Sequence, residues 1–357
     1  MIEPMQKTIR IEDVADFAGV STATVSRTLS HPHRVRESTR QLVQSAIEKL
    51  GYVPDATGRA LASGRTRTVG CLIPTLDHAI FARSTQALQT TLAQAGYQLL
   101  VASHNYDLAH EVVLAQALQQ RGVDAMVLVG ALHQPVLWKS LLAWQRPTML
   151  TWACDPRLPS VGFDNHAIGV MAATHLLGLG HKRIGVISGH TQHNDRAHAR
   201  LKGVSETLTA AGIRFENQMI SQQNLNISGG RLGLQDLFKA ADPPTAVICG
   251  NDLLAAGALL QAQRQGLIVP SDISICGIDN HELAGEMNPG LTTVSLPAND
   301  LGRIAATQIL AALAGEPIAQ QSLLPFSLVE RGTTAPPTHR INAQTKNLTR
   351  AKRSRSY

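Results

Sequence analysis

Residues 12–29 read EDVADFAGVSTATVSRTL, a pattern typical of two short helices joined by a tight turn. Gly19 permits a sharp turn, and Ser21 is placed to cap the second helix. The side chains expected to pack inside this unit are Val14, Ala15, Phe17, Val25 and Leu29. The stretch therefore predicts a helix-turn-helix.

The outer face of the second helix is small and polar at its start. Thr22, Ala23 and Ser26 are left outside, with the basic residue Arg27 one turn into the helix. Short side chains at this end of a helix can approach base edges in the major groove while an arginine contacts a phosphate. We therefore expect this helix to bind double-stranded DNA with sequence specificity.

A third amphipathic helix is predicted over residues 37–50, with Gly51 in the position that ends it. Its apolar residues recur at helical spacing: Leu42, Val43, Ala46, Ile47 and Leu50. Three helices would close a small core. This favours a DNA-binding head over the alternative, an ordinary helical bundle that contains a turn of the same kind.

The residues that follow, GYVPDATGRALA at 51–62, complete a set of three motifs. The other two are Asp13-Val14-Ala15 and the stretch 19–27, which reads GVSTATVSR. On these motifs the chain resembles the lactose-repressor/galactose-repressor (LacI/GalR) family of bacterial transcription regulators. The resemblance covers residues 9 to about 337.

The resemblance implies DNA-binding roles for residues in the head and in a hinge helix that follows it. Thr22 and Ala23 match positions that read major-groove bases, and Arg27 lies on the same helix. Leu61 matches a hinge leucine that wedges into the minor groove, and Arg59 belongs to the same motif. An apolar wedge of this kind kinks the duplex. In the family the hinge helix folds only on DNA.

Two residues depart from the family pattern. Gly58 replaces a usual alanine, which would weaken an isolated hinge helix by about 1 kcal/mol. Arg36 replaces a usual serine before the third helix, so a cap that contributes about 1 kcal/mol is expected to be missing. We expect Arg36 to offer an added phosphate contact instead.

Composition indicates more than one domain. A chain of 357 residues that is 44% hydrophobic is too long for one ordinary core, and two or three cores are expected. The net charge of +6 lies at the two ends, because residues 1–68 carry +3, residues 338–357 carry +6 and the middle carries −3. The middle is therefore expected to be a mildly acidic domain that need not touch DNA.

No apolar run of signal-peptide or membrane-span length occurs, so we expect a cytoplasmic protein without membrane contact. Residues 338–357 are basic without hydrophobic periodicity and are predicted to form a disordered tail. The tail has no heptad helix, which favours a homodimer over a tetramer. Four widely spaced cysteines are predicted to be buried free thiols: Cys71, Cys154, Cys249 and Cys276.

The rest of the chain alternates short apolar runs with helical patterns, which predicts an α/β fold of parallel sheets. The expected strands are residues 69–73, 98–102, 125–129, 148–152, 184–188, 246–249 and 273–278. The expected helices include residues 83–95, 109–121, 166–179, 199–211, 229–240 and 253–265. Such regular alternation over this length fits two doubly wound lobes.

The resemblance adds a periplasmic-binding-protein-like core whose lobes exchange segments near residues 165, 295 and 323. The expected division is a helix-turn-helix domain at 1–54, a hinge helix and linker at 55–66, an effector-binding and dimerisation core at 67–337, and the tail at 338–357. Within the core, lobe 1 is expected at about 67–165 and 295–323, and lobe 2 at about 166–294 and 324–337.

Ligands of open parallel sheets bind beyond the carboxyl ends of the strands. Trp152, Asn251 and Asp279 each stand at or just after such an end. Each could instead cap a helix or simply end a strand. Their convergence indicates a ligand site.

The resemblance implies ligand contacts at Arg200, Asn251 and Asp279, the first through the Arg-Leu-x-Gly pattern at 200–203. Expected neighbours are Phe81, Trp152, Asp164, Arg196 and Leu225, the last where relatives often have an aromatic residue. Carboxylate and amide groups suit vicinal hydroxyls, an aromatic ring can cover a sugar face, and arginine can take a carboxylate. Residues 73–82 and 161–165 look most like the gluconate-repressor branch, so the expected effector is a sugar acid such as gluconate or a ketogluconate.

Other chemical signals are weak. His190, His193 and His198 lie close together without a second ligand cluster, so no metal is expected. The Gly-Leu-Gly at 178–180 follows a helix, whereas a dinucleotide fingerprint follows a strand. No nucleophile with an identifiable base and no paired-acid motif occurs, so we expect neither a cofactor nor an enzyme.

The sequence therefore predicts a repressor of a carbohydrate or sugar-acid catabolic operon. It would bind an inverted-repeat operator as a homodimer, with its affinity controlled by the effector. The alternative is a sugar-binding protein or sugar-processing enzyme with a non-functional helical head. A periplasmic sugar receptor would need a signal sequence, which is missing.

Overall fold

The computed structural model describes residues 9–53 and 64–338. The chain divides after Arg67 into a small helical head and a larger α/β core. The predicted hinge residues Gly58, Arg59 and Leu61, and most of the predicted tail, lie outside the described residues.

The head consists of short helices whose ends follow the expected local signals. Its elements are α1 (Ile11–Ala18), α2 (Thr22–Ser30), the 3-10 turn η1 (Pro32–Arg34) and α3 (Glu37–Leu50). Gly19 and Gly51 have φ of 65° and 64° and end α1 and α3 in the left-handed region. The Ser21 hydroxyl accepts the Thr24 N–H at 3.2 Å, which confirms the predicted cap of α2.

The core of the head is small. Its fully buried apolar side chains are Val14, Ala15, Val25, Val43 and Ala46. Two predicted members are wrong, because Phe17 is 55% exposed and Leu42 is 57% exposed. A core of this size accepts one stripe from each helix, so residues beside a stripe stay outside. Phe17 instead lies under the Lys49 ammonium, 5.8 Å from its ring centre.

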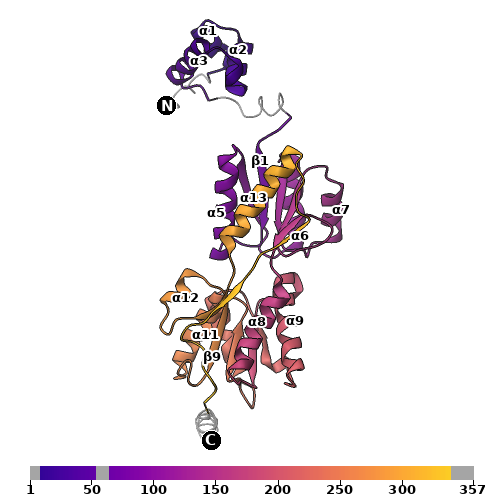
Figure 1. Ribbon diagram of the computed structural model, residues 1–357, viewed down its shortest axis with the longest axis vertical. Helices are drawn as coiled ribbons and strands as arrows, with labels where there is room; N and C mark the ends of the chain where they lie inside the picture. Colours follow the sequence, from indigo (N-terminus) through magenta and orange to yellow (C-terminus); the bar gives the residue numbers. More distant parts are fainter. Residues whose placement is uncertain (1–8, 54–63, 339–357) are drawn as a thin grey trace, which may run out of the picture. The chain divides into compact units, whose positions relative to one another are not determined.

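The first sheet of the core is wholly parallel, in the order β11-β5-β4-β3-β1-β2. Its strands are β1 (Thr68–Ile73), β2 (Gln98–Ser103), β3 (Ala125–Val129), β4 (Thr148–Trp152), β5 (Ser160–Gly162) and β11 (Gln321–Leu323). The helices α5 (Ala79–Gln94) and α13 (Ala298–Ala314) lie together against one face, and α6 (Leu108–Gln120) and α7 (Pro135–Ala143) pack on the other (Figure 1). Alternation along β1 produces these two faces, since Cys71 packs with the first pair of helices and Leu72 with the second.

The second sheet has the order β12-β10-β9-β8-β6-β7, with one antiparallel pair, β10 with β12, among its described strands. Its strands are β6 (Ile184–Ser188), β7 (Ile220–Gln222), β8 (Ala246–Cys249), β9 (Ser274–Asp279), β10 (Thr292–Ser295) and β12 (Ser327–Val329). It is covered by α8 (Asn165–Gly178) and α9 (Asp195–Ala210) on one face and by α10 (Ile227–Leu237) and α11 (Asp252–Arg264) on the other. Shorter elements are η2 (Thr191–His193), η3 (Asn217–Met219) and α12 (Glu282–Glu286).

The chain passes three times between the two sheets, after β5, after β10 and after β11. We call the half built on the first sheet lobe 1 and the half built on the second sheet lobe 2. The predicted fold class, a helical head followed by two doubly wound lobes, is confirmed.

The four cysteines are free, as predicted, but Cys154 is only half-buried because it lies in the loop after β4. None of the helices within residues 9–53 and 64–338 is long and apolar enough to cross a membrane.

Candidate functional site

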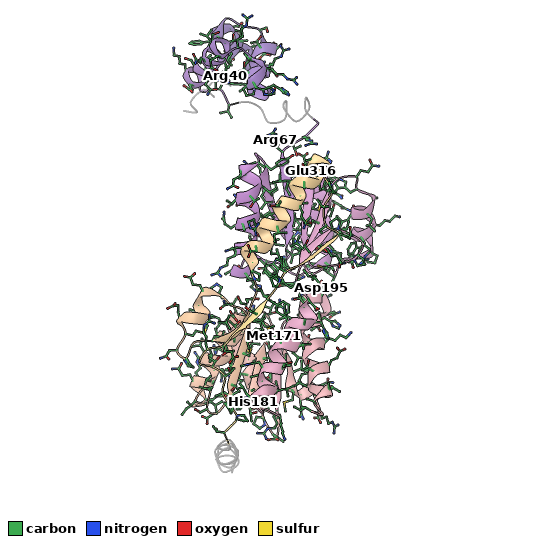
Figure 2. The ribbon with its side chains drawn as sticks, in the orientation of Figure 1. Arg40, Arg67, Met171, His181, Asp195 and Glu316 are labelled. Carbon is green, nitrogen blue, oxygen red and sulfur yellow. The ribbon has the colours of Figure 1, made fainter. Side chains whose placement is uncertain are left out.

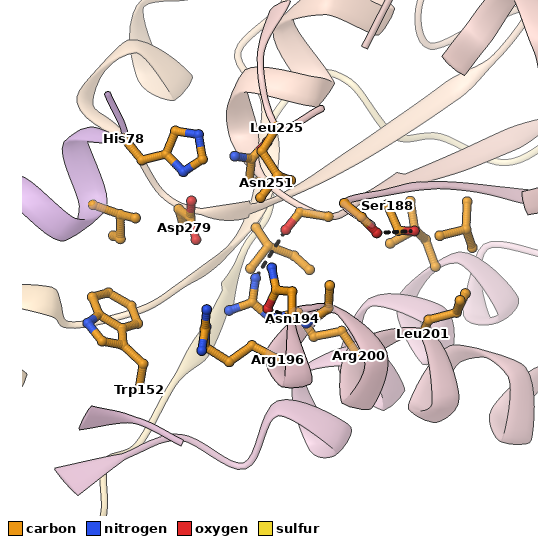
Figure 3. A pocket seen from close by; sticks show the side chains of 18 of the residues that line it. His78, Trp152, Ser188, Asn194, Arg196, Arg200, Leu201, Leu225, Asn251 and Asp279 are labelled. Atoms are coloured by element: carbon orange, nitrogen blue, oxygen red, sulfur yellow. Dashed lines mark hydrogen bonds between the residues drawn. The ribbon is translucent and has the colours of Figure 1, made fainter. Parts of the chain in front are cut away.

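A pocket lies between the two lobes, at the carboxyl ends of strands from both sheets (Figure 3). In each sheet the strand order reverses near this point, between β1 and β3 and between β6 and β8. Such reversals leave a crevice where ligands bind. Its polar and aromatic lining comprises His78, Phe81, Tyr106, Trp152, Ser188, Asn194, Arg196, Arg200, Asn251 and Asp279.

Lobe 1 contributes an aromatic wall. Trp152 ends β4 with φ of 71°, a left-handed conformation that is strained for a bulky residue. Its ring meets Phe81 of α5 edge-on at 5.3 Å, and His78, just before α5, stacks on Phe81 at 6.0 Å. Burial lowers the pKa of His78, while a hydrogen bond to the backbone of Leu225 opposes that shift. The His78 ring is therefore largely neutral near pH 7, and it contacts the backbone of lobe 2 at Leu225.

Lobe 2 contributes a guanidinium that is fixed on two sides. Arg200 of α9 donates through Nε to Asn165 Oδ1 and through Nη1 to the Gly250 carbonyl, both at 3.0 Å. The close approach of α8 to α9 holds this arrangement, because a Cβ on Gly169 would lie 2.0 Å from the Arg200 carbonyl oxygen. Burial lowers the pKa of Arg200, and the nearby Asp279 charge opposes that change. The group remains a cation at any ordinary pH.

Asp279 faces this arginine from the end of β9, with φ of 119°. Loss of water raises the pKa of Asp279 to about 8, and the charge on Arg200 opposes the shift. Its carboxyl group therefore carries a proton for much of the time near pH 7. Backbone strain and a raised pKa at one pocket residue are both typical of binding sites.

Two further residues combine a structural and a pocket position. Asn251 lines the pocket, and its Oδ1 also caps α11 by accepting the Leu254 N–H at 2.9 Å. Arg196 is only 6% exposed and donates through Nη1 to Asp195 Oδ1 at 2.7 Å. Figure 3 shows its guanidinium on the Trp152 side of the pocket. Arg196 is thus paired with the carboxylate of Asp195 beside the pocket. Arg200 instead faces Asp279, whose carboxyl group is largely protonated near pH 7.

Seven of the eight predicted effector residues line this pocket: Phe81, Trp152, Arg196, Arg200, Leu225, Asn251 and Asp279. Asp164 does not, and its placement there was wrong. Its side chain is exposed and caps α8 by accepting the Ala167 N–H at 2.9 Å. The next residue, Asn165, points inward instead and holds Arg200.

Sequence reasoning missed several lining or supporting residues: His78, Tyr106, Asn165, Ser188 and Asn194. Two of them carried a signal that could have found them. Tyr106 comes shortly after the end of β2, where the strand-end rule applies, and it has φ of 61°. Asn194 directly precedes α9 and caps it, with its Oδ1 accepting the Ala197 N–H at 3.1 Å.

The head presents a second candidate surface. The predicted DNA-contacting residues Thr22, Ala23, Ser26 and Arg27 are all exposed on α2. The inward side of the same helix is formed by Val25 and Thr28. The start of α2 therefore offers short side chains and one cation to the outside, on a helix held by a small core.

No group of three or more His, Cys, Asp or Glu residues within the described ranges could hold a metal ion. His190 and His193 stand at and within η2, and His198 is in α9.

Comparison with known proteins covers both units. Residues 10–55 match the model of bacterial regulatory proteins of the lacI family, and residues 173–334 match a periplasmic binding protein-like domain. The repressor CytR of Escherichia coli (strain K12) is 34% identical over 330 residues, which cover 91% of this chain and 96% of that protein. The repressor PurR of Salmonella paratyphi B is 32% identical with the same coverage.

A solved structure of the lac repressor dimer, bound to operator and the anti-inducer ONPF, is similar with a TM-score of 0.83. It is 25% identical and covers 92% of this chain and 100% of that chain. These relatives are regulators and not enzymes, in agreement with the head and the pocket. The chain belongs to the lacI family of bacterial regulatory proteins, as a regulator rather than an enzyme.

Proposed function

We propose that this protein is a transcriptional repressor that binds an inverted-repeat operator as a homodimer and responds to a sugar-acid effector. The observation that carries the DNA-binding part is the exposed start of α2 on a capped helix-turn-helix within a lacI-family chain. Repressor function is supported by CytR and PurR, both of which are named repressors. Such a regulator acts on the chromosome, hence in the cytoplasm.

Within the head, Thr22 and Ala23 would contact base edges, while Ser26 and Arg27 would contact the edge of the groove and its phosphates. Leu61 would wedge into the minor groove, and Arg59 of the same motif would also contact the DNA. These roles follow the predicted division into head, hinge, bilobed core and tail, which we keep as part of the proposal.

The sugar-acid effector is supported by the two unlike walls of the pocket. Trp152 and Phe81 offer apolar ring surface for the CH face of a sugar. Asp279, when protonated, leaves the positive charge of Arg200 in excess, which favours a ligand with one carboxylate. Asn251 adds an amide for hydroxyl groups.

A homodimer is supported by the lac repressor dimer and by an apolar edge on lobe 1. Leu100 and Val101 on the edge strand β2 are 38% and 40% exposed, and Val113 on the adjacent α6 is 58% exposed. Exposed edge strands with apolar side chains are usually covered by a partner.

The mechanism is thermodynamic linkage. A ligand that contacts both lobes favours one angle between them, and the dimer transmits that angle to the paired hinges. Operator affinity would then change by the coupling free energy, typically about 1–3 kcal/mol.

The test combines DNA selection with calorimetry. Full-length protein is used to select an inverted repeat from random duplexes, and its affinity is measured for two half-sites and for one across a salt series. We expect strong preference for two half-sites and a steep loss of affinity with salt. Equal affinity for any duplex would contradict the proposed regulator function. It would support the alternative, a sugar-binding protein or sugar-processing enzyme with a non-functional helical head.

Calorimetry then compares gluconate and a ketogluconate with neutral glucose. We expect binding of an acid and none of glucose. Binding of a neutral sugar alone would remove the sugar-acid part. Leu61→Ala should weaken operator binding and leave ligand affinity unchanged, and an equal loss of both would contradict the separation of roles.

A further inference from the structure

The start of α9 forms a direct link between the lobes. Asp195, its first residue, belongs to lobe 2, yet its Oδ2 accepts the backbone N–H of Ala131 in lobe 1 at 2.7 Å. Figure 2 shows Asp195 at the junction of the two lobes. Ala131 follows the end of β3 by two residues, so the link attaches α9 to the rim of the first sheet.

The same carboxylate also holds a pocket residue. Asp195 Oδ1 accepts from Arg196 Nη1 at 2.7 Å, and the two side chains are 23% and 7% exposed. One carboxylate thus joins the main chain of lobe 1 to an arginine that lines the ligand pocket. A buried guanidinium is stable only when its charge is paired and its N–H groups are satisfied. Asp195 provides that pairing.

Lobe 1 is shaped to receive this arginine. A Cβ on Gly130 would lie 2.2 Å from Arg196 Nη1 and 3.0 Å from Asp195 Oδ1. Gly130 also has φ of 92°, which side-chain-bearing residues rarely adopt. Its N–H donates to the Thr151 carbonyl at 2.8 Å, so its backbone is tied to β4 next to Trp152. The bare backbone of Gly130 is therefore the surface against which the guanidinium rests.

We propose that Asp195 is a positioning residue that couples lobe closure to ligand capture, by holding Ala131 and Arg196 at once with the guanidinium seated on Gly130. In closed lobes Arg196 is fixed beside Trp152 and available to a ligand. In separated lobes the carboxylate loses the Ala131 N–H and the guanidinium loses its seat. This inference rests on the proposed ligand site. The two hydrogen bonds that the Asp195 carboxylate accepts, from the Ala131 N–H and from Arg196, are together called the clasp, and they can be tested without any ligand.

The first measurement is hydrogen exchange of the Ala131 amide in full-length protein without added ligand. In Asp195→Ala we expect the Ala131 amide to exchange about 10- to 100-fold faster, because this is the protection that one hydrogen bond to a charged group provides. The matched control is Asp300→Ala, because Asp300 also stands in the first turn of a helix and pairs with an arginine, Arg303, at 3.0 Å. It should leave Ala131 at the wild-type rate. Equal exchange in wild type and Asp195→Ala would overturn the clasp.

The second measurement separates the two bonds of the carboxylate. Asp195→Asn keeps an oxygen for the Ala131 N–H and removes the charge that pairs with Arg196. We expect Ala131 to stay protected while the affinity for gluconate falls about tenfold or more through faster dissociation. Wild-type gluconate affinity in Asp195→Asn would overturn the positioning of Arg196.

Gly130→Ala tests the same contact from lobe 1 and leaves Asp195 unchanged. We expect faster Ala131 exchange and weaker gluconate binding, because the added methyl group meets the guanidinium. An unchanged Ala131 exchange rate together with an unchanged gluconate affinity would contradict the contact of the Arg196 guanidinium with Gly130. If gluconate does not bind the wild type, the sugar-acid proposal fails, while the exchange measurements still decide the clasp.

Discussion

The head and the core place their functional side chains in opposite ways. In the head, four of the residues proposed to touch DNA, Thr22, Ala23, Ser26 and Arg27, lie within six positions on the exposed face of one helix, which is supported by five buried side chains. In the core, the pocket residues are largely buried and come from segments as far apart as His78 and Asp279. The head can therefore be disabled by a single core substitution, whereas the pocket fails one interaction at a time. The two functions should be separable by mutation.

The largest expected effect is on the head. Val25→Asp buries a carboxylate in a core of five side chains, where Val25 is fully inaccessible. We expect destabilisation of the head by more than about 4 kcal/mol and loss of operator binding, with an unchanged melting transition of the core. Circular dichroism and fluorescence anisotropy measure these quantities. Val136→Asp, at a valine that is 52% exposed on α7, serves as the matched control. A Val25→Asp protein that still binds operator would contradict the dependence of α2 on this core.

The next effect is on the pocket. Arg200→Ala removes the hydrogen bonds to Asn165 and Gly250 and leaves Asp279 without its cation. We expect ligand affinity to fall by about 2–5 kcal/mol, while operator affinity without ligand stays at the wild-type value. Arg183→Ala is the control, since Arg183 lies in the same lobe and bonds the Pro243 carbonyl outside the pocket. Unchanged ligand affinity by calorimetry in Arg200→Ala would remove this residue from the site.

Asp279→Asn tests the electrostatics of the pocket through pH. An aspartate with a pKa raised from 3.8 to about 8 binds a proton more tightly in the folded state, so its stabilising contribution is complete below about pH 4 and is lost as pH rises to about 8. Asparagine imitates the protonated form and avoids that loss. The variant should therefore exceed the wild type in stability by more at pH 8 than at pH 5. Melting curves at the two pH values check this, and a difference independent of pH would contradict it.

The smallest effect returns to the head. Arg36 precedes α3 and makes no side-chain cap, so Arg36→Ser should stabilise the head by about 1 kcal/mol. Urea denaturation of wild type and variant measures the gain. If Arg36 also contacts a phosphate, the slope of log affinity against log salt should fall by about one in the variant. An unchanged free energy of unfolding would show that serine does not cap α3.

The two regions also differ in how far the sequence predicts them. The turn at Gly19, the cap at Ser21 and the bounds of α3 depend on neighbours along the chain, and the structure confirms them. Four strands of the core, β3, β4, β6 and β8, coincide with the expected ranges. Short strands such as β5 and β11 were not predicted, because three residues carry no periodicity and their pairing depends on distant segments. Helix α13 was missed as well, although it covers lobe 1 from the far end of the chain.

The pocket was predicted in part for the same reason. The strand-end rule found Trp152 and Asp279, since their position depends on the end of a single strand. It cannot state which of two adjacent polar residues turns inward, as Asp164 and Asn165 illustrate. The clasp of Asp195 with Ala131 joins residues 64 positions apart and has no local signal.

The most direct test of the account is the operator dissociation constant, measured by anisotropy on the selected inverted repeat with and without gluconate at a concentration that saturates the pocket in calorimetry. The account predicts a change of about 5- to 150-fold, corresponding to a coupling of about 1–3 kcal/mol, and loss of that change in Arg200→Ala. An operator affinity that stays constant while the pocket is saturated would contradict the claim that a ligand between the lobes controls the DNA-binding head.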